Sequence, residues 1–298
     1  AEVAERLDLP SKAGPGTKAS GEKLAKKSPL WVRLRLLAED LGPTFIKLGQ
    51  LMSQRPDLLP KELILELRKL QDQVSPAEIG DIRRTIQKAL GKPVEEIFSE
   101  FDEKPLASAS LAQVHRARLL ESGQQVAVKV RRPGVAEVIE ADLALLTDLA
   151  KALHERLSGI RRFNLPGLVQ EISHHLRLEL DFNKEARNML SARSRRSEKK
   201  LLIIPEPNLD LTRQSVLIMD LVEGQRLEDA RLSQKEGKQL AQDLGDALLD
   251  QVLKQGFFHA DPHPGNVIVV SRPGGKPRLA LIDWGLVGHL TAEMRYLF

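Results

Sequence analysis

The sequence predicts an α+β fold in which short helices come first and strands follow in separate groups. Apolar residues between Leu30 and Leu90 recur at helical spacing, and prolines divide that stretch into several short helices. Strand-like runs rich in Val, Leu and Ile occupy 114–119, 126–130, 202–204, 216–219, 267–270 and 279–282. Longer helical patterns cover 135–158, 167–196 and 234–256. Because strands and helices do not alternate one by one, a parallel βαβ sheet is not expected.

Local signals mark several element boundaries. Ser75-Pro76-Ala77-Glu78 has the spacing of a capping box, with Ser75 as the N-cap of the following helix. Ser122-Gly123 separates two strand-like runs as a turn. The helix over 234–256 is expected to end at Gly256, since glycine is a common C-terminal stop.

Composition excludes several classes of protein. The chain has 298 residues, enough for about two domains, and its 42% hydrophobic and 29% charged residues are typical of a folded protein. Cysteine is absent, which excludes disulfides, cysteine-bound zinc, iron–sulfur clusters and a cysteine nucleophile. A net charge of +4 with few aromatic residues does not favour nucleic acid as a partner. No apolar run is long enough to span a membrane, so this stretch of chain is expected to be soluble.

The strongest chemical signal lies near the end of the sequence. His259-Ala-Asp-Pro-His-Pro-Gly-Asn266 precedes Asp283-Trp-Gly285, with an apolar run between them. An H-x-D-x-x-x-x-N loop followed by D-x-G supplies the groups that phosphoryl transfer requires. Asp261 is the candidate base, and Asn266 and Asp283 are candidate Mg²⁺ ligands. The alternative is a polar turn between strands. We expect His263 to brace the loop, and His259 to pack and form hydrogen bonds within it and not at the phosphate.

A lysine and three acids form a second group of candidates. Val126-Ala-Val-Lys129 is typical of the strand lysine that contacts nucleotide phosphates. Glu179, Asp181 and Glu185 lie in the helical pattern that follows, and the first and last of them are not stacked on one helical face. One acid could pair with Lys129 while another faces elsewhere. A solvated acidic stretch is the alternative.

The stretch before Lys129 lacks the G-x-G-x-x-G of ordinary protein kinases. It reads Leu-Ala-Ser-Ala-Ser-Leu-Ala-Gln-Val-His over 106–115, and the Cβ atoms of Ala and Ser restrict how closely the backbone can wrap a phosphate. We therefore expect altered nucleotide handling. The candidate nucleotide-binding residues here are Ala107, Ser108, Ala109, Ser110 and Gln113.

These motifs together resemble the UbiB/ADCK family of atypical, protein-kinase-like proteins, which is linked to ubiquinone and other prenylquinone biosynthesis. The most specific match is Phe45-Ile-Lys47-Leu-Gly-Gln50, which is similar to the family's K-x-G-Q motif. Glu179-Leu-Asp181 is similar to its E-x-D motif. The resemblance implies a kinase-like fold with a small mixed-sheet N-lobe, a mostly helical C-lobe and an N-terminal helical extension that carries K-x-G-Q. The predicted division of the chain has four parts. A basic flexible leader covers 1–29 and the helical extension 30–103. The N-lobe with a helical insert covers 104–225, and the start of a truncated C-lobe covers 226–298.

The resemblance also assigns roles. Glu185 matches the glutamate that pairs with the strand lysine, and Lys47 is implied to meet the E-x-D acids at the active site, together with Gln50. The expected cofactors are ATP or ADP with Mg²⁺, and the expected substrate is ATP itself or a small lipid-like molecule. Expected partners are a lipid or quinone precursor and a quinone biosynthetic complex. Contact with a bacterial, mitochondrial or plastid membrane is expected for a full-length protein that continues beyond Phe298. The alternatives are a non-catalytic nucleotide- and lipid-binding scaffold and a small-molecule kinase of the aminoglycoside or choline type.

Overall fold

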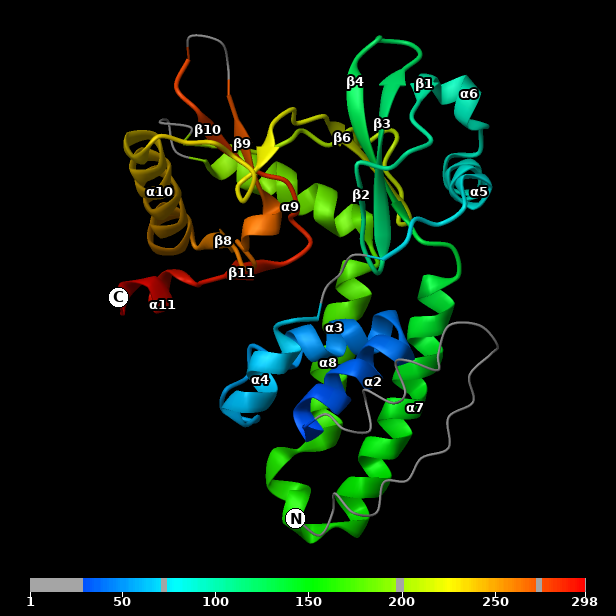
Figure 1. The fold of residues 1–298 in the computed structure, drawn as a ribbon, viewed down its shortest axis with the longest axis vertical. Helices are drawn as coiled ribbons and strands as arrows, with labels where there is room; N and C mark the ends of the chain where they lie inside the picture. The colour runs from blue at the N-terminus through cyan, green and yellow to red at the C-terminus, as the bar shows by residue number, and fades with distance from the viewer. Residues whose placement is uncertain (1–28, 71–73, 197–200, 272–274, 298) are drawn as a thin grey trace. The chain divides into compact units, whose positions relative to one another are not determined.

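The computed structural model describes residues 29–70, 74–196, 201–271 and 275–297 (Figure 1). The predicted basic leader lies outside these residues. The chain divides into an N-terminal unit that ends at Gln71 and a main unit that begins at Asp72. The sequence analysis placed the end of the helical extension at residue 103. The structural division comes earlier because the helices after residue 78 pack on the sheet of the main unit.

The N-terminal unit is built from short helices, as the sequence predicts. They are α2 (Leu30–Leu41), α3 (Pro43–Met52) and α4 (Lys61–Leu67). Pro43 occupies the first turn of α3, where its missing N–H costs no hydrogen bond. Ile46, Leu63, Leu67 and Leu70 form the core, against which Trp31 packs.

The glycine and glutamine of K-x-G-Q have structural partners in this unit. A Cβ on Gly49 would lie 3.2 Å from Cδ2 of Leu67 and closer still to Cδ1 of Leu70. The Gln50 amide nitrogen donates a hydrogen bond to the Leu70 carbonyl over 3.2 Å. The motif thus holds α3 against the residues that end the unit.

The main unit begins with a five-stranded antiparallel sheet covered on one face by two helices. Its order is β1-β3-β4-β6, with β2 paired to β3. The strands are β1 (Phe98–Phe101), β2 (Ala107–Ser108), β3 (Ala112–Leu119), β4 (Gln125–Arg131) and β6 (Val216–Asp220), and the helices are α5 (Ile79–Leu90) and α6 (Val94–Ile97). The expected capping box is wrong: α5 starts after Glu78 with no side-chain cap, because residues 74–77 run alongside the sheet instead.

A second sheet shares its core with the first through α9 (Phe182–Arg195). Its order is β5-β10-β9-β7, and a separate pair joins β8 to β11. The strands are β5 (Leu202–Ile203), β7 (Gln225–Arg226), β8 (Phe257–His259), β9 (Val267–Val270), β10 (Arg278–Leu281) and β11 (Val287–His289). Apolar residues of α9 pack with both sheets in one cluster, which also contains Trp284. Helix α9 therefore aligns the two sheets with each other.

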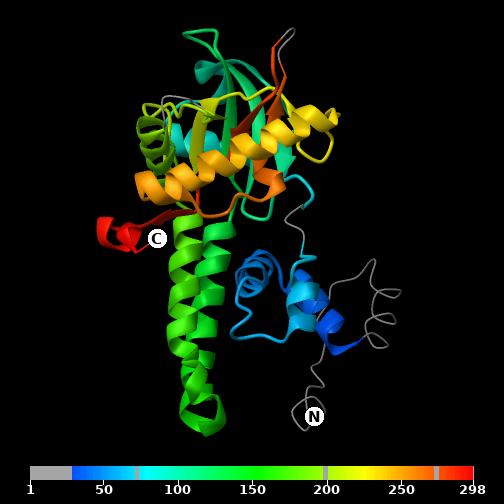
Figure 2. The ribbon, with the colours of Figure 1, turned by 90° about the vertical axis from the view of Figure 1, so that its left-hand side faces the viewer.

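The remaining helices match the predicted stretches with two differences. The pattern over 167–196 is two helices, because α8 (Leu165–Glu179) ends and Asp181 caps α9 by accepting from Asn183 N. Helix α8 runs back along α7 (Val135–Arg156) as a hairpin (Figure 2). Helix α10 (Gln234–Leu249) continues as a π-helix over Asp250–Gln255 and stops at Gly256, whose φ is 65°. The last helix is α11 (Ala292–Tyr296). In the part of the chain that is described, no helix combines the length and apolarity needed to cross a membrane.

A buried polar relay crosses the face of the first sheet that α5 covers. The backbone N–H of Ala77 donates to Gln113 Oε1 over 2.9 Å, so the side-chain amide nitrogen of Gln113 points the other way, toward His115. That nitrogen lies 2.7 Å from His115 Nε2, and His115 Nδ1 lies 2.7 Å from the Asp102 carbonyl. Every bond has one possible direction, since Gln113 must donate to His115 and His115 must donate to Asp102. The imidazole is therefore neutral, and burial lowers its pKa.

We expect Gly49→Ala to destabilise the N-terminal unit. Alanine gains up to about 1 kcal/mol of helix propensity over glycine, but overpacking a core costs about 1–3 kcal/mol. Gly245→Ala in α10 is the matched control, because a Cβ there meets no atom within 4 Å, and it should raise stability. Urea unfolding followed by far-ultraviolet circular dichroism, which reports on the helices of both units, measures the two effects. Stabilisation of equal size by both changes would contradict the packing argument.

The free energy of unfolding should fall between pH 7 and pH 5, partly through His115. Its folded pKa is lowered, so on acidification the unfolded chain binds a proton that the folded chain excludes. His115→Phe should be less stable at pH 7 but lose less stability on acidification. Urea midpoints at both pH values test this, with His174→Gln, an exposed change on α8, as control. An unchanged pH dependence in His115→Phe would contradict the relay.

Candidate active site

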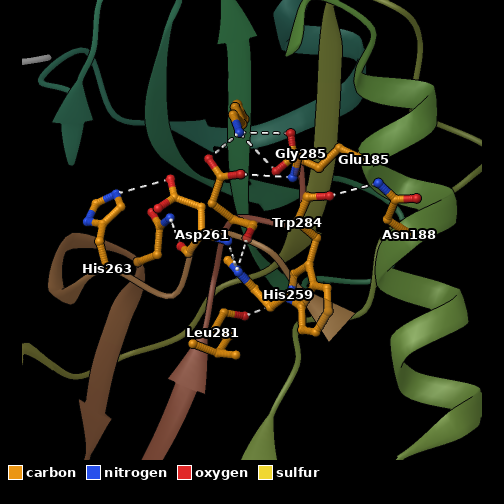
Figure 3. Close-up of polar contacts among 11 residues, drawn as sticks. Glu185, Asn188, His259, Asp261, His263, Leu281, Trp284 and Gly285 are labelled. Atoms are coloured by element: carbon orange, nitrogen blue, oxygen red, sulfur yellow. Dashed lines mark hydrogen bonds and ion pairs between the residues drawn. The ribbon is translucent and has the colours of Figure 1, made fainter. Parts of the chain in front are cut away.

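One lysine joins three distant parts of the main unit. Lys129 Nζ lies 2.9 and 2.8 Å from the two carboxylate oxygens of Glu185, and 2.9 Å from Oδ2 of Asp283. Lys129 is on β4, Glu185 is in the first turn of α9, and Asp283 follows β10 (Figure 3). The structure thus brings together the lysine and glutamate that the sequence analysis pairs, and adds Asp283 as a third member.

Burial sets the electrostatics of this cluster. The Glu185 side chain is 4% exposed and that of Asp283 is 42% exposed, so solvent reaches the cluster from the aspartate side. Burial raises the pKa of Glu185 to about 7, against the opposing effect of Lys129. Burial alone would lower the pKa of Lys129, but Asp283 and Glu185 outweigh it and raise that pKa. Lys129 therefore stays charged at neutral pH.

Trp284 fixes the aspartate from behind. Its indole is fully buried, donates to the Leu281 carbonyl over 3.1 Å and stacks on Phe257. Asn188 of α9 donates to the Trp284 carbonyl over 2.9 Å. The Gly285 N–H donates to Oδ1 of Asp283 over 2.9 Å. One oxygen of Asp283 is thus held by backbone, and the other faces Lys129.

His259 connects the loop over residues 259–266 to the segment that carries Asp283. Its Nδ1 accepts from the Asp261 N–H over 3.1 Å, which fixes the proton on Nε2, 2.5 Å from the Asp283 carbonyl. Burial lowers the pKa of His259, so the imidazole is neutral. Gln251, in the π-helix, accepts from the His259 N–H. The prediction that His259 bonds within its own loop was too narrow, because it bridges two loops.

The loop brings Asp261 and Asn266 within hydrogen-bonding distance of each other. The Asn266 amide nitrogen donates to the Asp261 carbonyl over 3.2 Å, which leaves the amide oxygen out of that bond. His263 braces the loop as expected: its Nδ1 accepts from Gly265 N–H over 3.0 Å, and its Nε2 lies 3.9 Å from Asp261 Oδ2 (Figure 3). A bond from Ile282 N to Asn266 O ties this loop to the stretch before Asp283.

These donors fit Mg²⁺. Asp283 and Asn266 offer a carboxylate and an amide oxygen, the hard ligands that Mg²⁺ accepts alongside water and substrate phosphates. Among the residues that are described, no group of three or more His, Cys, Asp or Glu side chains could hold a metal ion by itself.

Strands β2 and β3 and the turn between them form a hairpin whose first part, residues 106–115, we call the alanine-rich hairpin. Its side chains alternate between the two faces of the sheet. Ala107, Val114 and Lys129 are partners in register across β2, β3 and β4, so they share a face. Ser108 and Gln113 are paired one residue along and face the opposite side. Ala107 therefore lies on the same face of the sheet as Lys129. Direct contact through the Gln113 side chain finds no support in this geometry.

The other predicted positions have local roles in the structure. Ala109 N donates to Ala112 O and closes the turn that also contains Ser110. Glu179 ends α8, and Asp181 caps α9 one turn before Glu185. Lys47 and Gln50 belong to the N-terminal unit, so their placement at the active site stays a prediction.

The sequence analysis did not single out Asn188, Gln251 or Arg132. Asn188 and Gln251 orient the two loops, and Arg132 contacts the alanine-rich hairpin. Asn188 lies three residues after Glu185, one helical turn along α9, and this spacing could have pointed to it. Gln251 and Arg132 gave no comparable signal. The partner of Gln251 is the backbone N–H of His259, and Arg132 contacts Ser75, Ser108 and Ala109, none of which shares a helix with it.

Comparison with known proteins agrees with this geometry. Residues 69–298 match the model of the ABC1 atypical kinase-like domain. Proteins named "Probable protein kinase UbiB" are 39% identical over 267 residues in Cellvibrio japonicus and 43% identical over 264 residues in Pseudomonas entomophila. These matches cover 89% and 88% of this chain but 48% and 49% of the relatives, so the chain spans about half their length.

A solved structure is similar as well. It is the complex of Rv3197 with erythromycin from Mycobacterium tuberculosis, with a TM-score of 0.61 and 26% identity, covering 91% of this chain and 66% of that one. The kinase-like fold expected from the sequence is thereby confirmed. The lysine–glutamate–aspartate cluster, the H-x-D-x-x-x-x-N loop and these matches lead to one conclusion. The chain belongs to the ABC1 family of atypical kinase-like proteins, which includes proteins named UbiB.

Proposed function

We propose that the chain forms the nucleotide-binding core of an atypical kinase or ATPase that binds ATP or ADP with Mg²⁺. The observation that carries the proposal is the shared ion pair of Lys129 with Glu185 and Asp283, beside a loop that presents Asp261 and Asn266. A charged lysine directly beside the exposed carboxylate of Asp283 is suited to bind phosphate oxygens.

Each residue has a separate task in this proposal. Asp283 and Asn266 would hold Mg²⁺, which neutralises charge on the phosphates. Glu185 keeps Lys129 extended toward Asp283, because both of its oxygens accept from the ammonium group. Asp261, 40% exposed, accepts the proton of the attacking hydroxyl or water. The two ring nitrogens of His259 bond to the backbone of Asp261 and of Asp283, and so fix the position of one aspartate relative to the other.

For the biological role, we propose support of ubiquinone or other prenylquinone biosynthesis. The support is the UbiB name shared by relatives at about 40% identity, together with the K-x-G-Q and E-x-D motifs. The substrate would be ATP itself or a small lipid-like molecule such as a quinone precursor. Contact with a membrane and with a quinone biosynthetic complex would belong to the full-length protein.

Asp→Asn changes should separate metal binding from proton transfer. Asp283→Asn should abolish Mg²⁺-dependent nucleotide binding. Asp261→Asn should keep binding but lose turnover by about 10²–10⁴-fold, the usual contribution of a general base. Calorimetric titration with ADP and an ATP hydrolysis assay, with and without lipid, measure both, and Asp243→Asn on α10 is the control. Nucleotide binding without hydrolysis in the unmodified protein under both conditions would favour a scaffold.

Removing the lysine should affect stability and binding differently. Lys129→Met leaves Glu185 and Asp283 without their cation, so the melting temperature should fall. The double variant Lys129→Met/Glu185→Gln should regain much of that stability, since it removes the buried charge. Its nucleotide affinity should stay low, because the phosphate-binding cation is still missing. Thermal melts with and without Mg²⁺ and ADP distinguish the two effects. Recovery of affinity in the double variant would exclude Lys129 from phosphate binding.

A further inference from the structure

Residues 74–77, which we call the strap, run alongside the alanine-rich hairpin, and three of the four form hydrogen bonds to the hairpin or to Arg132. Val74 N donates to Ser108 O over 3.4 Å. The Ser75 carbonyl accepts from the Arg132 guanidinium over 3.0 Å. Ala77 N donates to Gln113 Oε1 over 2.9 Å. The strap therefore holds both strands of the hairpin, since Ser108 is in β2 and Gln113 in β3.

Arg132 is the centre of this arrangement. Besides Ser75 O, its guanidinium contacts Ser108 Oγ over 3.2 Å and Ala109 O over 3.4 Å. Its own N–H donates to Leu111 O, so backbone and side chain both grip the hairpin turn. Within the described part of the chain, no carboxylate pairs with Arg132, and burial lowers the pKa of the guanidinium. The half-buried Arg132 side chain donates only to carbonyl and hydroxyl oxygens, and it thereby holds the strap and the hairpin turn together.

Gln113 is the second residue that joins the strap to the hairpin, and it is anchored more deeply. Its amide joins Ala77 to His115, and His115 continues to the Asp102 carbonyl at the end of β1. The His115 ring also stacks on Phe101, with ring centres 5.0 Å apart. Because Gln113 and His115 face away from Lys129, neither contacts the nucleotide side of the sheet. Their effect on that side passes through the backbone of β3, where Val114 lies opposite Lys129.

We propose that the strap fixes the alanine-rich hairpin at a set distance from Lys129, and that Arg132 and Gln113 are positioning residues for nucleotide binding. The inference rests on the proposed function. A glycine-rich loop must lose its conformational freedom when it closes on a nucleotide, whereas a hairpin held in advance has already lost it. Alanine and serine limit the backbone further. Preorganisation of this kind raises affinity without any new contact to the ligand.

The test compares arginine removal at two ends of the same sheet. Arg132→Met should weaken binding of Mg²⁺–ADP by about tenfold, equivalent to ~1.4 kcal/mol, and should accelerate hydrogen exchange over residues 107–112. Arg118→Met is the control. Arg118, on β3, bonds Glu100 of β1 and the Gly123 carbonyl in the turn after β3, away from the hairpin turn, so its loss should leave affinity unchanged. Arg132→Lys should restore part of the affinity, because an ammonium can still reach some of the carbonyls. Turnover at saturating ATP should change less than KM, since the catalytic groups are intact.

Gln113→Met provides a second variant of similar size should Arg132→Met fold poorly, and it should show the same rise in KM and in exchange. Faster exchange in the variants with unchanged ADP affinity would overturn the proposal while leaving the proposed function in place. Equal weakening by Arg118→Met and Arg132→Met would overturn it as well, because the effect would then be general destabilisation. If the unmodified protein bound no Mg²⁺–ADP, the proposed function would fail and this inference with it.

Discussion

The structure depends on a buried charge that one lysine shares between two carboxylates. Lys129 with Glu185 and Asp283 carries one positive and up to two negative charges, and burial raises the pKa of Glu185 to about 7 in response. Two anions at one half-buried site are costly unless further positive charge arrives. Asp283 is the open member, so a cation with its phosphates would reach the cluster there. In the function proposed above, the same imbalance that costs stability would attract a metal-bound nucleotide.

The rest of the main unit keeps these charges in place. Helix α9 contributes Glu185 to the ion pair and Asn188 to the Trp284 carbonyl, so one rigid helix sets both sides of the cluster. Its apolar face packs with the cores of both sheets, which means that a shift of either sheet would move Glu185. His259 performs the equivalent task for the loops, because its neutral ring has one donor and one acceptor and uses both.

Residues that act chemically were easier to find in the sequence than residues that position them. Lys129, Glu185, Asp261, Asn266 and Asp283 follow from motif spacing and resemblance, since phosphoryl transfer restricts which side chains can serve. Element positions followed from hydrophobic periodicity, including the stop at Gly256. The capping box at Ser75 failed because a local pattern was overridden by a tertiary contact with Arg132. The break between α8 and α9 was missed for a similar reason: Asp181 was considered only as a charge, yet it is also a helix cap.

The same distinction applies to K-x-G-Q. Gly49 is required where α3 meets Leu67 and Leu70, and Gln50 bonds to the Leu70 carbonyl, so two of the motif's three defined letters have structural tasks within the N-terminal unit. Substitutions at either position would disturb folding along with any effect on chemistry. Lys47 is the third defined residue of the motif, and it is the one to which the resemblance assigns a chemical role. The unit ends at Gln71 and the strap begins at Val74, so the strap closely follows the N-terminal unit along the chain, after α4 and not after the motif's own helix α3.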